Sequence, residues 1–258
     1  SPCYNSDGVC VLQEDYQDSV LCAVRYLDGD NRPVINPKTG YATMLVEYED
    51  DNRTREAYLD AEGNPCCCKD GYAEARFTYE DGNQTGTAYF GTDGLPCYYQ
   101  KIAAEQRTYK DGRLISVRTY DVTGALKGID GGYAEIRNAY DDLGYLTQVA
   151  YYDGQGKPCK GPEGCACVRY AYDAKGRKVE EAYFNADQEA VNGSDHYHAL
   201  IDTYDENGRQ QSQSCLNTLG NYGCANGIST VRNVYDQRGN LTERSLYLWS
   251  EGQEKPAN

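Results

Sequence analysis

The sequence predicts an all-β fold: a solenoid or spiral sheet of about eight antiparallel β-hairpin repeats, each about 31 residues long. A tyrosine returns at steps of 30 to 32 residues, and a fixed period of this size is typical of repeat proteins. β-Branched and aromatic residues alternate with polar ones before it, as in half-buried strands. A turn containing Asp follows each one. These key tyrosines are Tyr16, Tyr48, Tyr79, Tyr109, Tyr140, Tyr172, Tyr204 and Tyr235.

The segment before each key tyrosine is expected to be the first strand of a hairpin. In 136–140 and 231–235 the residue four positions before the tyrosine is apolar and shares its face, because side chains alternate along a strand. In four repeats an arginine lies three positions before the tyrosine, which places it on the opposite face. These arginines are Arg76, Arg137, Arg169 and Arg232.

The turns after the key tyrosines have two lengths. Four repeats carry Asp-x-x-Gly, in which Asp bonds its own backbone and Gly supplies a positive φ. The turn in 79–83 is one residue shorter than the turn in 172–177. A returning strand and a looser connection rich in Gly, Pro and Cys complete the unit, so sixteen strands and no helix are expected. The longer turns are 141–144, 173–176, 205–208 and 236–239.

We expect residues 1–258 to form a single repeat array, with 1–15 as a partial repeat. Pro2-Cys3 precedes Tyr16 at the distance at which Pro65-Cys66 precedes Tyr79. A lone hairpin is barely stable in water, so the units must pack against one another. A long ribbon, a spiral sheet and a closed ring all satisfy this requirement. Hairpin units begin near residues 16, 48, 79, 109, 140, 172, 204 and 235.

The composition and net charge of the chain limit the classes of partner that it is expected to bind. Tyrosine supplies 26 residues against 3 Phe and 1 Trp, which suits a thin structure whose rings are half in water. The net charge of -15 disfavours nucleic acids and anionic membrane surfaces, and no apolar run reaches the ~20 residues of a membrane helix. Cations, neutral polymers such as glycans, and further copies of the chain remain as partners.

The twelve cysteines lack any zinc-binding spacing and are interpreted as disulfide staples formed in an oxidising compartment, outside the cell or at its surface. Free thiols in a cytosolic protein are the alternative. Cys3 with Cys10, Cys159 with Cys165 or Cys167, and Cys215 with Cys224 can each close one loop. Cys66, Cys67 and Cys68 are expected to reach neighbouring units or another chain. The remaining candidates are Cys22 and Cys97.

Other candidate sites are weak. Asp195, His196 and His198 would be metal ligands, but no further ligand is evident, so loop decoration is preferred and no metal is assigned. Acidic turns at 28–31 and 49–52 suggest Ca²⁺ as a possible counter-ion, although no complete calcium loop is present. No catalytic motif is found, so an enzyme is not expected. Glycan-acceptor patterns fall at Asn52, Asn83, Asn192 and Asn240.

The Tyr-Asp-x-x-Gly units resemble the YD repeats of the bacterial RHS family, and they look still closer to the long-period tandem YD-like repeats of secreted bacterial proteins. The motifs begin at Tyr140, Tyr172, Tyr204 and Tyr235, and the resemblance covers nearly the whole chain. It implies strands of a spiralling β-shell, which in RHS proteins surrounds a toxic cargo. Such repeats specify architecture more than function.

The two ends of the sequence lie at matching points of the repeat. Residues 247–253 align with 58–64, and Ser1-Pro2-Cys3 aligns with Asn64-Pro65-Cys66, so no cap is expected at either end. Contacts that repeat without closing form filaments. We therefore expect a structural subunit of an extracellular, head-to-tail filament. The alternatives are a secreted or cell-surface module that binds carbohydrate or another ligand, and a fragment of an RHS-type toxin-enclosing shell.

Overall fold

The computed structural model describes residues 8–129, 132–223, 227–250 and 252–257. The chain divides into two compact units, Ser1–Ile129 and Asp130–Asn258, called here the N-terminal and the C-terminal unit. The described residues form seventeen β-strands and no α-helix, in agreement with the predicted all-β fold. No helix in this part of the chain is long and apolar enough to cross a membrane.

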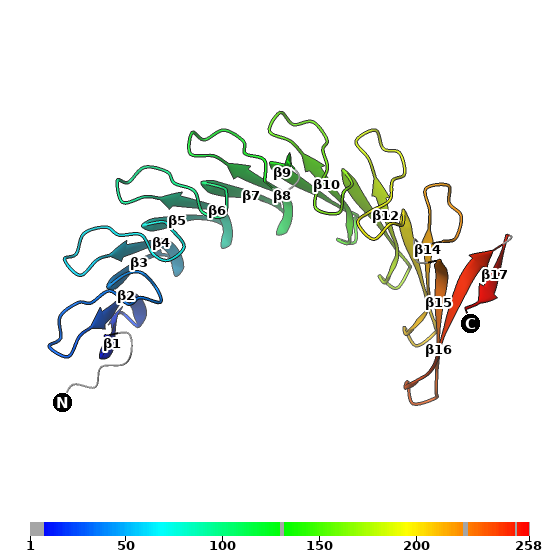
Figure 1. Ribbon diagram of the computed structural model, residues 1–258, viewed down its shortest axis with the longest axis horizontal. Coiled ribbons are helices and arrows are strands. Elements are labelled where there is room, and N and C mark those ends of the chain that lie inside the picture. The colour runs from blue at the N-terminus through cyan, green and yellow to red at the C-terminus, as the bar shows by residue number, and fades with distance from the viewer. Residues whose placement is uncertain (1–7, 130–131, 224–226, 251, 258) are drawn as a thin grey trace. The chain divides into compact units, whose positions relative to one another are not determined.

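The N-terminal unit contains eight strands, each antiparallel to the next (Figure 1). A tight turn after the key tyrosine joins the two strands of a hairpin, and a longer loop leads to the next hairpin. The strands are β1 (Val11–Gln17), β2 (Val20–Leu27), β3 (Thr43–Glu49), β4 (Asn52–Leu59), β5 (Glu74–Glu80), β6 (Asn83–Phe90), β7 (Ala104–Lys110) and β8 (Arg113–Tyr120).

The C-terminal unit repeats this pattern in four further hairpins and adds one strand. Each of its key tyrosines is the last residue of the first strand of a hairpin. The strands are β9 (Glu135–Tyr140), β10 (Leu146–Tyr152), β11 (Cys167–Tyr172), β12 (Lys178–Phe184), β13 (Ala199–Tyr204), β14 (Gln210–Leu216), β15 (Ile228–Tyr235), β16 (Leu241–Ser250) and β17 (Gln253–Pro256).

Pairing within a hairpin is longer than pairing between hairpins. Strands β3 and β4 pair at seven positions, whereas β4 and β5 pair at three. The pairs β2–β3 and β6–β7 also have three positions, as do β10–β11 and β12–β13. Neighbouring hairpins are therefore hydrogen-bonded near the connecting loops and separate toward their tips. This leaves a gap between successive tips.

A row of tyrosine rings forms the core of the N-terminal unit beneath the connecting loops. Rings from strands alternate with rings from loops, and successive centroids lie 4.8 to 5.8 Å apart. Each such pair contributes about 0.5 to 1.5 kcal/mol beyond the burial of its area. The thin, tyrosine-rich core predicted from composition is confirmed here. In chain order the rings are Tyr26, Tyr41, Tyr58, Tyr72, Tyr89 and Tyr99.

The arginines that precede the key tyrosines cover aromatic rings on the other face of the sheet. The Arg76 guanidinium lies 4.1 Å from the centroid of Phe90, the ring at the end of the returning strand of its own hairpin. The same contact recurs in the C-terminal unit, at 3.9 to 4.3 Å. The predicted opposite-face placement is consistent with these contacts, which shield the rings from water. The recurring pairs are Arg137–Tyr152, Arg169–Phe184 and Arg232–Tyr247.

Strand β17 was not expected from the repeat. In the other repeats the returning strand ends where an Asp, Asn or Gly starts a turn, such as Asp60, whose Oδ1 accepts the N–H of Glu62 and Asn64. Trp249 occupies that position in the last repeat, so β16 continues to Ser250 and the chain then reverses. The carboxylate of Glu254 on β17 pairs with Arg232. This last hairpin departs from the repeat, so the described residues contain one strand more than the sixteen expected.

Of the cysteines predicted as disulfide staples, nine of the ten that the structure describes are free thiols. Among the described cysteines Cys215 is disulfide-bonded, and Cys3 and Cys224 lie outside the described residues. Cys165 and Cys167 are buried at 1% and 2% exposure and fill space as small apolar residues. Burial raises the pKa of Cys165 to about 11, which makes it a poor nucleophile. The free thiols are Cys10, Cys22, Cys66, Cys67, Cys68, Cys97, Cys159, Cys165 and Cys167.

Candidate binding site at the hairpin tips

The hairpin tips of the two units are built differently. In the N-terminal unit two residues with positive φ form each turn, the arrangement of a type I′ hairpin. Asp50 and Asp51, for example, have φ values of 47° and 64°, and Glu49 pairs directly with Asn52. The other turns of this kind are Asp18-Ser19, Asp81-Gly82 and Asp111-Gly112.

In the C-terminal unit the predicted Asp-x-x-Gly turns are present and use their side chains as expected. The Oδ1 atom of Asp173 accepts the N–H groups of Lys175 and Arg177, at 2.9 and 3.0 Å. Gly176 closes the turn with a φ of 77°. The turns that begin at Asp205 and Asp236 repeat these bonds.

The longer turn places a side chain over the key tyrosine of the next hairpin. The Arg177 guanidinium lies 4.7 Å from the centroid of Tyr204, and its Nε atom donates to Asp173 at 2.7 Å. Its Nη1 atom also donates to the carbonyl oxygen of Asp205, at 3.2 Å. The hydroxyl of Tyr204 donates to the carbonyl oxygen of Lys178 on the preceding hairpin, at 2.9 Å. We call this arrangement a closed tip, because it fills the gap between hairpins.

Two more closed tips follow the same plan. Arg209 lies over Tyr235 at 4.9 Å, and the hydroxyl of Tyr235 donates to the carbonyl oxygen of Gln210. At the third, Tyr145 replaces the arginine and stacks on Tyr172 with centroids 4.9 Å apart. The key tyrosine therefore ties each of these hairpins to the one before it.

In the N-terminal unit the corresponding gaps are empty. Tyr48, Tyr79 and Tyr109 make no side-chain hydrogen bond, ring contact or cation contact with the described residues. The turns are one residue shorter, so no residue stands where Arg177 stands. A cavity adjoins each of these three tyrosines, with volumes of about 470, 450 and 430 Å³. We call these three sites the open tips.

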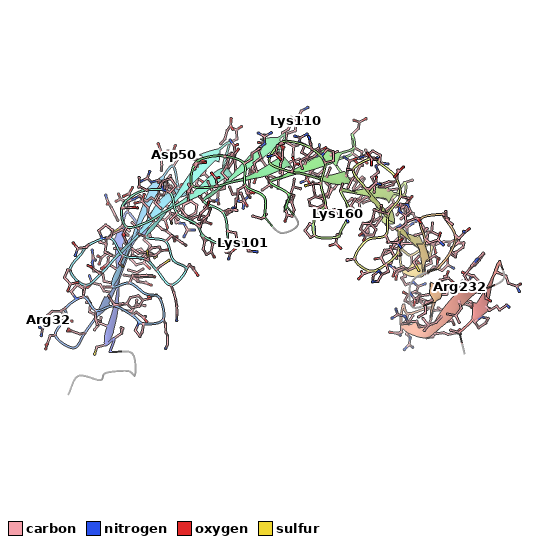
Figure 2. All side chains as sticks on the ribbon, turned by 45° about the horizontal axis from the view of Figure 1, so that its top comes forward. Arg32, Asp50, Lys101, Lys110, Lys160 and Arg232 are labelled. Atoms are coloured by element: carbon pink, nitrogen blue, oxygen red, sulfur yellow. The ribbon has the colours of Figure 1, made fainter. Side chains whose placement is uncertain are left out.

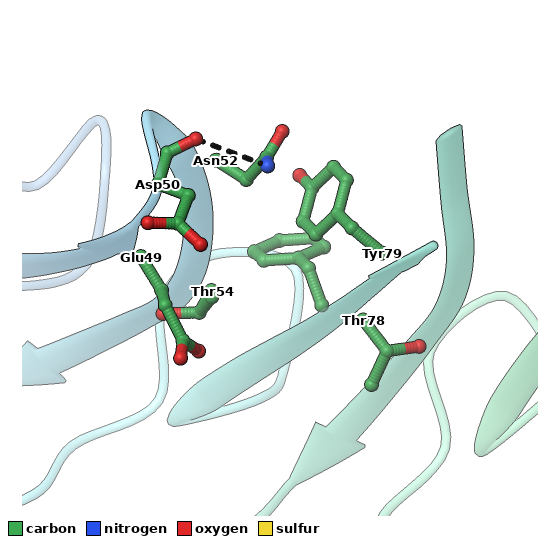
Figure 3. A pocket seen from close by; sticks show the side chains of 7 residues that line it. Glu49, Asp50, Asn52, Thr54, Thr78 and Tyr79 are labelled. Carbon is green, nitrogen blue, oxygen red and sulfur yellow. Dashed lines mark hydrogen bonds between the residues drawn. The ribbon is translucent and has the colours of Figure 1, made fainter. Parts of the chain in front are cut away.

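The Tyr79 tip shows the chemistry best (Figure 3). Glu49, Asp50, Asn52 and Thr54 of one hairpin and Phe77, Thr78 and Tyr79 of the next line the cavity, and Asp50 and Asn52 lie across it from Tyr79. The Nδ2 atom of Asn52 donates to the carbonyl oxygen of Asp50 at 3.2 Å, which fixes the amide beside the cavity that it lines.

Phe77, which also lines this cavity, is already covered by a cation from the chain itself. The Arg53 guanidinium lies 4.9 Å from its centroid and pairs with Glu56 at 2.5 Å. No such group covers Tyr79 among the described residues.

The other two open tips share the plan. The Tyr109 cavity is lined by Glu80, Asp81, Asn83 and Thr85 from one hairpin and by Asp111 and Gly112 from the next. Figure 2 shows Asp50 and Lys110 along the edge of the N-terminal unit where the tips lie, and Lys101 toward the loops.

The Tyr48 cavity has fewer unpaired carboxylates than the other two open tips. It contains Asp18 and Glu47, but Glu47 is paired with Arg55 at 2.6 Å. Each open tip thus offers an aromatic ring and carboxylates to one ligand, and two of them add an amide and a hydroxyl.

The two histidines named as weak metal-ligand candidates lie apart from any group of ligands in the described residues. His196 lies in a turn with a φ of 64°, and the Nδ1 atom of His198 faces the carbonyl oxygens of Tyr183 and Val191 at 2.8 and 3.3 Å. In the part of the chain that the structure describes, no group of three or more His, Cys, Asp or Glu side chains is arranged to hold a metal.

The acidic turn proposed for Ca²⁺ uses its first carboxylate internally. The Oδ1 atom of Asp28 accepts the N–H groups of Asp30 and Arg32 at 2.8 and 3.0 Å. The second acidic turn suggested for Ca²⁺, at 49–52, belongs to the Tyr79 tip. Of the glycan-acceptor asparagines, Asn52 and Asn83 line open tips, and Asn240 donates to Asp236 at 2.9 Å.

Two of the three cysteines expected to reach neighbouring units lie in the same side-chain cluster as a cysteine of the next connecting loop. Cys66 and Cys68 of one connecting loop and Cys97 of the next pack in the same cluster of tyrosine rings. Burial raises the pKa of both Cys66 and Cys97. A bond between these loops remains a prediction.

The closed tips should make stability depend on acid pH. The side-chain bond from Arg177, followed by the backbone bonds, lowers the pKa of Asp173 from 3.8 to about 2. Because the folded pKa lies below the unfolded one, this stabilisation is complete above about pH 4 and is lost as the pH falls toward 2. Asp173→Asn keeps the acceptor oxygen of the turn but cannot titrate. We expect the stability difference between wild type and D173N, measured by urea unfolding, to shrink between pH 4 and 2. A difference that is constant over this range would contradict the assignment.

The sequence contains the signal for the open tips, since the shorter turn is visible in it. The length alone does not say that the missing residue is the one that covers the next tyrosine. That step needs the pairing of neighbouring hairpins, which places one tip beside the following key tyrosine.

No protein-family model and no curated protein matches the chain. Two crystal structures of TcdB2-TccC3 match it over most of its length. The first covers 94% of this chain and 14% of the other at 10% identity, with a TM-score of 0.40. The second, TcdB2-TccC3-TEV, covers 93% and 12% at 14% identity, with a TM-score of 0.39. A third, with Cdc42, covers 90% and 15%, with a TM-score of 0.22.

These matches extend over the part of the chain that resembles YD repeats. The chain spans less than a sixth of the length of the structures that it matches. At such identities and TM-scores the likeness concerns general architecture and carries no information on activity or partner.

Proposed function

We propose that this chain is an extracellular binding module whose open tips each bind one of the sugar rings along a linear polysaccharide. The observation that carries the proposal is the threefold repetition of one cavity, each beside an uncovered key tyrosine. The equivalent tyrosines of the closed tips are covered by the chain itself. Open tips are therefore a property of particular repeats and not of the repeat in general.

The size and lining of the cavities suit a sugar. Ligand sites usually have volumes of about 300 to 1,000 Å³ and combine apolar surface with a few polar groups, and the open tips lie at the low end of this range. A tyrosine ring offers its apolar face to the C–H groups of a pyranose. Asn52, Thr54 and the carboxylates beside them offer partners for hydroxyl groups. A polymer with a regular repeat can use several such sites together.

The test is a glycan array followed by calorimetry with the polysaccharide that binds best. Tyr79→Ala removes the ring of the central site, and we expect affinity to fall about tenfold, since one such contact is worth about 1.4 kcal/mol. Tyr98→Ala is the matched control, because Tyr98 is 46% exposed and lies in a connecting loop. Equal affinity for both variants, or no binding to any glycan, would refute the proposal.

A structural role remains the second candidate, favoured by the exposed first strand. In β1 the side chains of Val11, Leu12 and Tyr16 are 39%, 55% and 58% exposed, and such a strand can accept a partner strand. Negative-stain electron microscopy of native and reduced samples, with Leu12→Lys as the variant, tests it. Regular filaments that disappear in L12K support assembly, and monodisperse particles at high concentration oppose it. The toxin-enclosing shell implied by the YD resemblance stays a prediction.

A further inference from the structure

The closed tips show which chemistry occupies the space above a key tyrosine. At two of the three closed tips the occupant is a guanidinium, from Arg177 over Tyr204 and from Arg209 over Tyr235. Each cation also pairs with the carboxylate of its own turn, at 2.5 Å to Asp173 and 2.6 Å to Asp205. The position therefore combines an aromatic face, a carboxylate and a carbonyl oxygen around one cation.

The open tips keep the ring and the carboxylates but lack the cation. Glu49 and Asp50 at the Tyr79 tip make no ion pair with the described residues, and the same holds for Glu80 and Asp81 at the Tyr109 tip. No Lys or Arg lines either cavity.

The cations nearest along the chain do not fill these sites. Arg53 pairs with Glu56 and covers Phe77. Lys110 and Arg113 flank the turn at Asp111 without lining the cavity. Two adjacent sites thus present unpaired carboxylates beside an uncovered ring.

We propose that the open tips bind a polysaccharide whose sugars carry protonated amino groups, with each ammonium lying between the key tyrosine and the carboxylates of the preceding turn. This inference rests on the proposed function and names the class of its ligand. An ammonium over a tyrosine face gains a cation–π contact, and a flanking carboxylate adds a charge-assisted hydrogen bond. The net charge of -15 draws a polycation toward the chain.

The Tyr79 and Tyr109 tips carry this preference, and the Tyr48 tip does not. At the Tyr48 tip Glu47 is neutralised by Arg55, which leaves Asp18 as the one unpaired carboxylate of that cavity. Selectivity for amino sugars therefore depends on the two successive sites between β4 and β7, while the Tyr48 site accepts neutral sugars equally well.

The test compares two ligands of equal length: the hexamer of β-1,4-linked glucosamine and that of N-acetylglucosamine. Binding to the full chain is measured by calorimetry at about pH 5.5, where the amines are protonated, and at the same ionic strength. We expect the glucosamine hexamer to bind at least about tenfold more tightly. In the double variant E49Q/E80Q, which leaves Asp50 and Asp81 in place, this preference should fall at least about threefold, with affinity for the acetylated hexamer unchanged within about twofold.

Charge attraction alone is excluded by a matched control. The variant E62Q/E180Q removes the same net charge at exposed positions that do not line the open tips, and it should keep the full preference. If it loses the preference as E49Q/E80Q does, or if both hexamers bind the wild type equally, the inference fails and the proposed function stands. If neither hexamer nor any other glycan binds, both fail. Hexaarginine binding that is lost in Tyr79→Ala, without glycan binding, would identify a basic peptide as the ligand instead.

Discussion

Tyr58→Ala is expected to lower the free energy of unfolding of the N-terminal unit by about 3 to 5 kcal/mol, the usual cost of deleting a large buried ring. Tyr58 is 6% exposed and lies at the centre of the tyrosine row, with ring centroids 4.8 Å from Tyr41 and 5.8 Å from Tyr72. Burial, followed by the nearby charge of Glu56, raises the pKa of its hydroxyl. Its removal opens a cavity that the rings of Tyr41 and Tyr72 do not close, because each of them also packs on a second tyrosine of the row.

Tyr48→Ala is the control for this substitution. The two residues have the same side chain and lie on the two strands of the same hairpin. Tyr48, however, is 40% exposed, and no described ring packs on it. We expect its effect to stay within about 0.5 to 1 kcal/mol. Urea unfolding followed by tyrosine fluorescence measures both. Similar losses for both variants would show that the loop-side row is not the core of the unit.

The hairpin architecture follows from local chemistry, which is why it can be predicted from the sequence. The alternation before the key tyrosines and the Asp-x-x-Gly turns each act over fewer than twelve residues. The period of 30 to 32 residues repeats them, and all three signals point to the same strands. Strand β17 could not be predicted in this way. It depends on Trp249 replacing a turn-forming residue, which is a departure from the repeat and not a part of it.

The candidate site is harder to predict because it lies between repeats. The sequence shows that the turn at Asp81-Gly82 is one residue shorter than the turn at Asp173–Gly176. Only the three-position pairing of neighbouring hairpins shows that their tips separate and that the residue after the longer turn covers the next tyrosine. A contact between residues 27 to 31 positions apart is set by packing, and the pattern within one repeat does not contain it.

The disulfide interpretation shows a different limit. Cysteine count and spacing predict a compartment and a set of candidates, but they cannot give pairings. Buried thiols such as Cys165 and Cys167 satisfy packing without any bond, so the same residues suit either state.

The triple variant Tyr48→Ala, Tyr79→Ala and Tyr109→Ala should abolish binding of a polysaccharide long enough to span the three open tips. If each ring contributes about 1.4 kcal/mol, the loss reaches about 1,000-fold, and avidity makes it larger for a long polymer than for a single sugar. Stability should change little, because none of the three hydroxyls bonds to the described residues.

The matched control substitutes the three key tyrosines of the closed tips, Tyr172, Tyr204 and Tyr235, each of which bonds the preceding hairpin. That control should reduce the stability of the C-terminal unit and leave binding intact. A binding loss in the control that matches the loss in the open-tip variant would mean that the ligand does not distinguish the two kinds of tip.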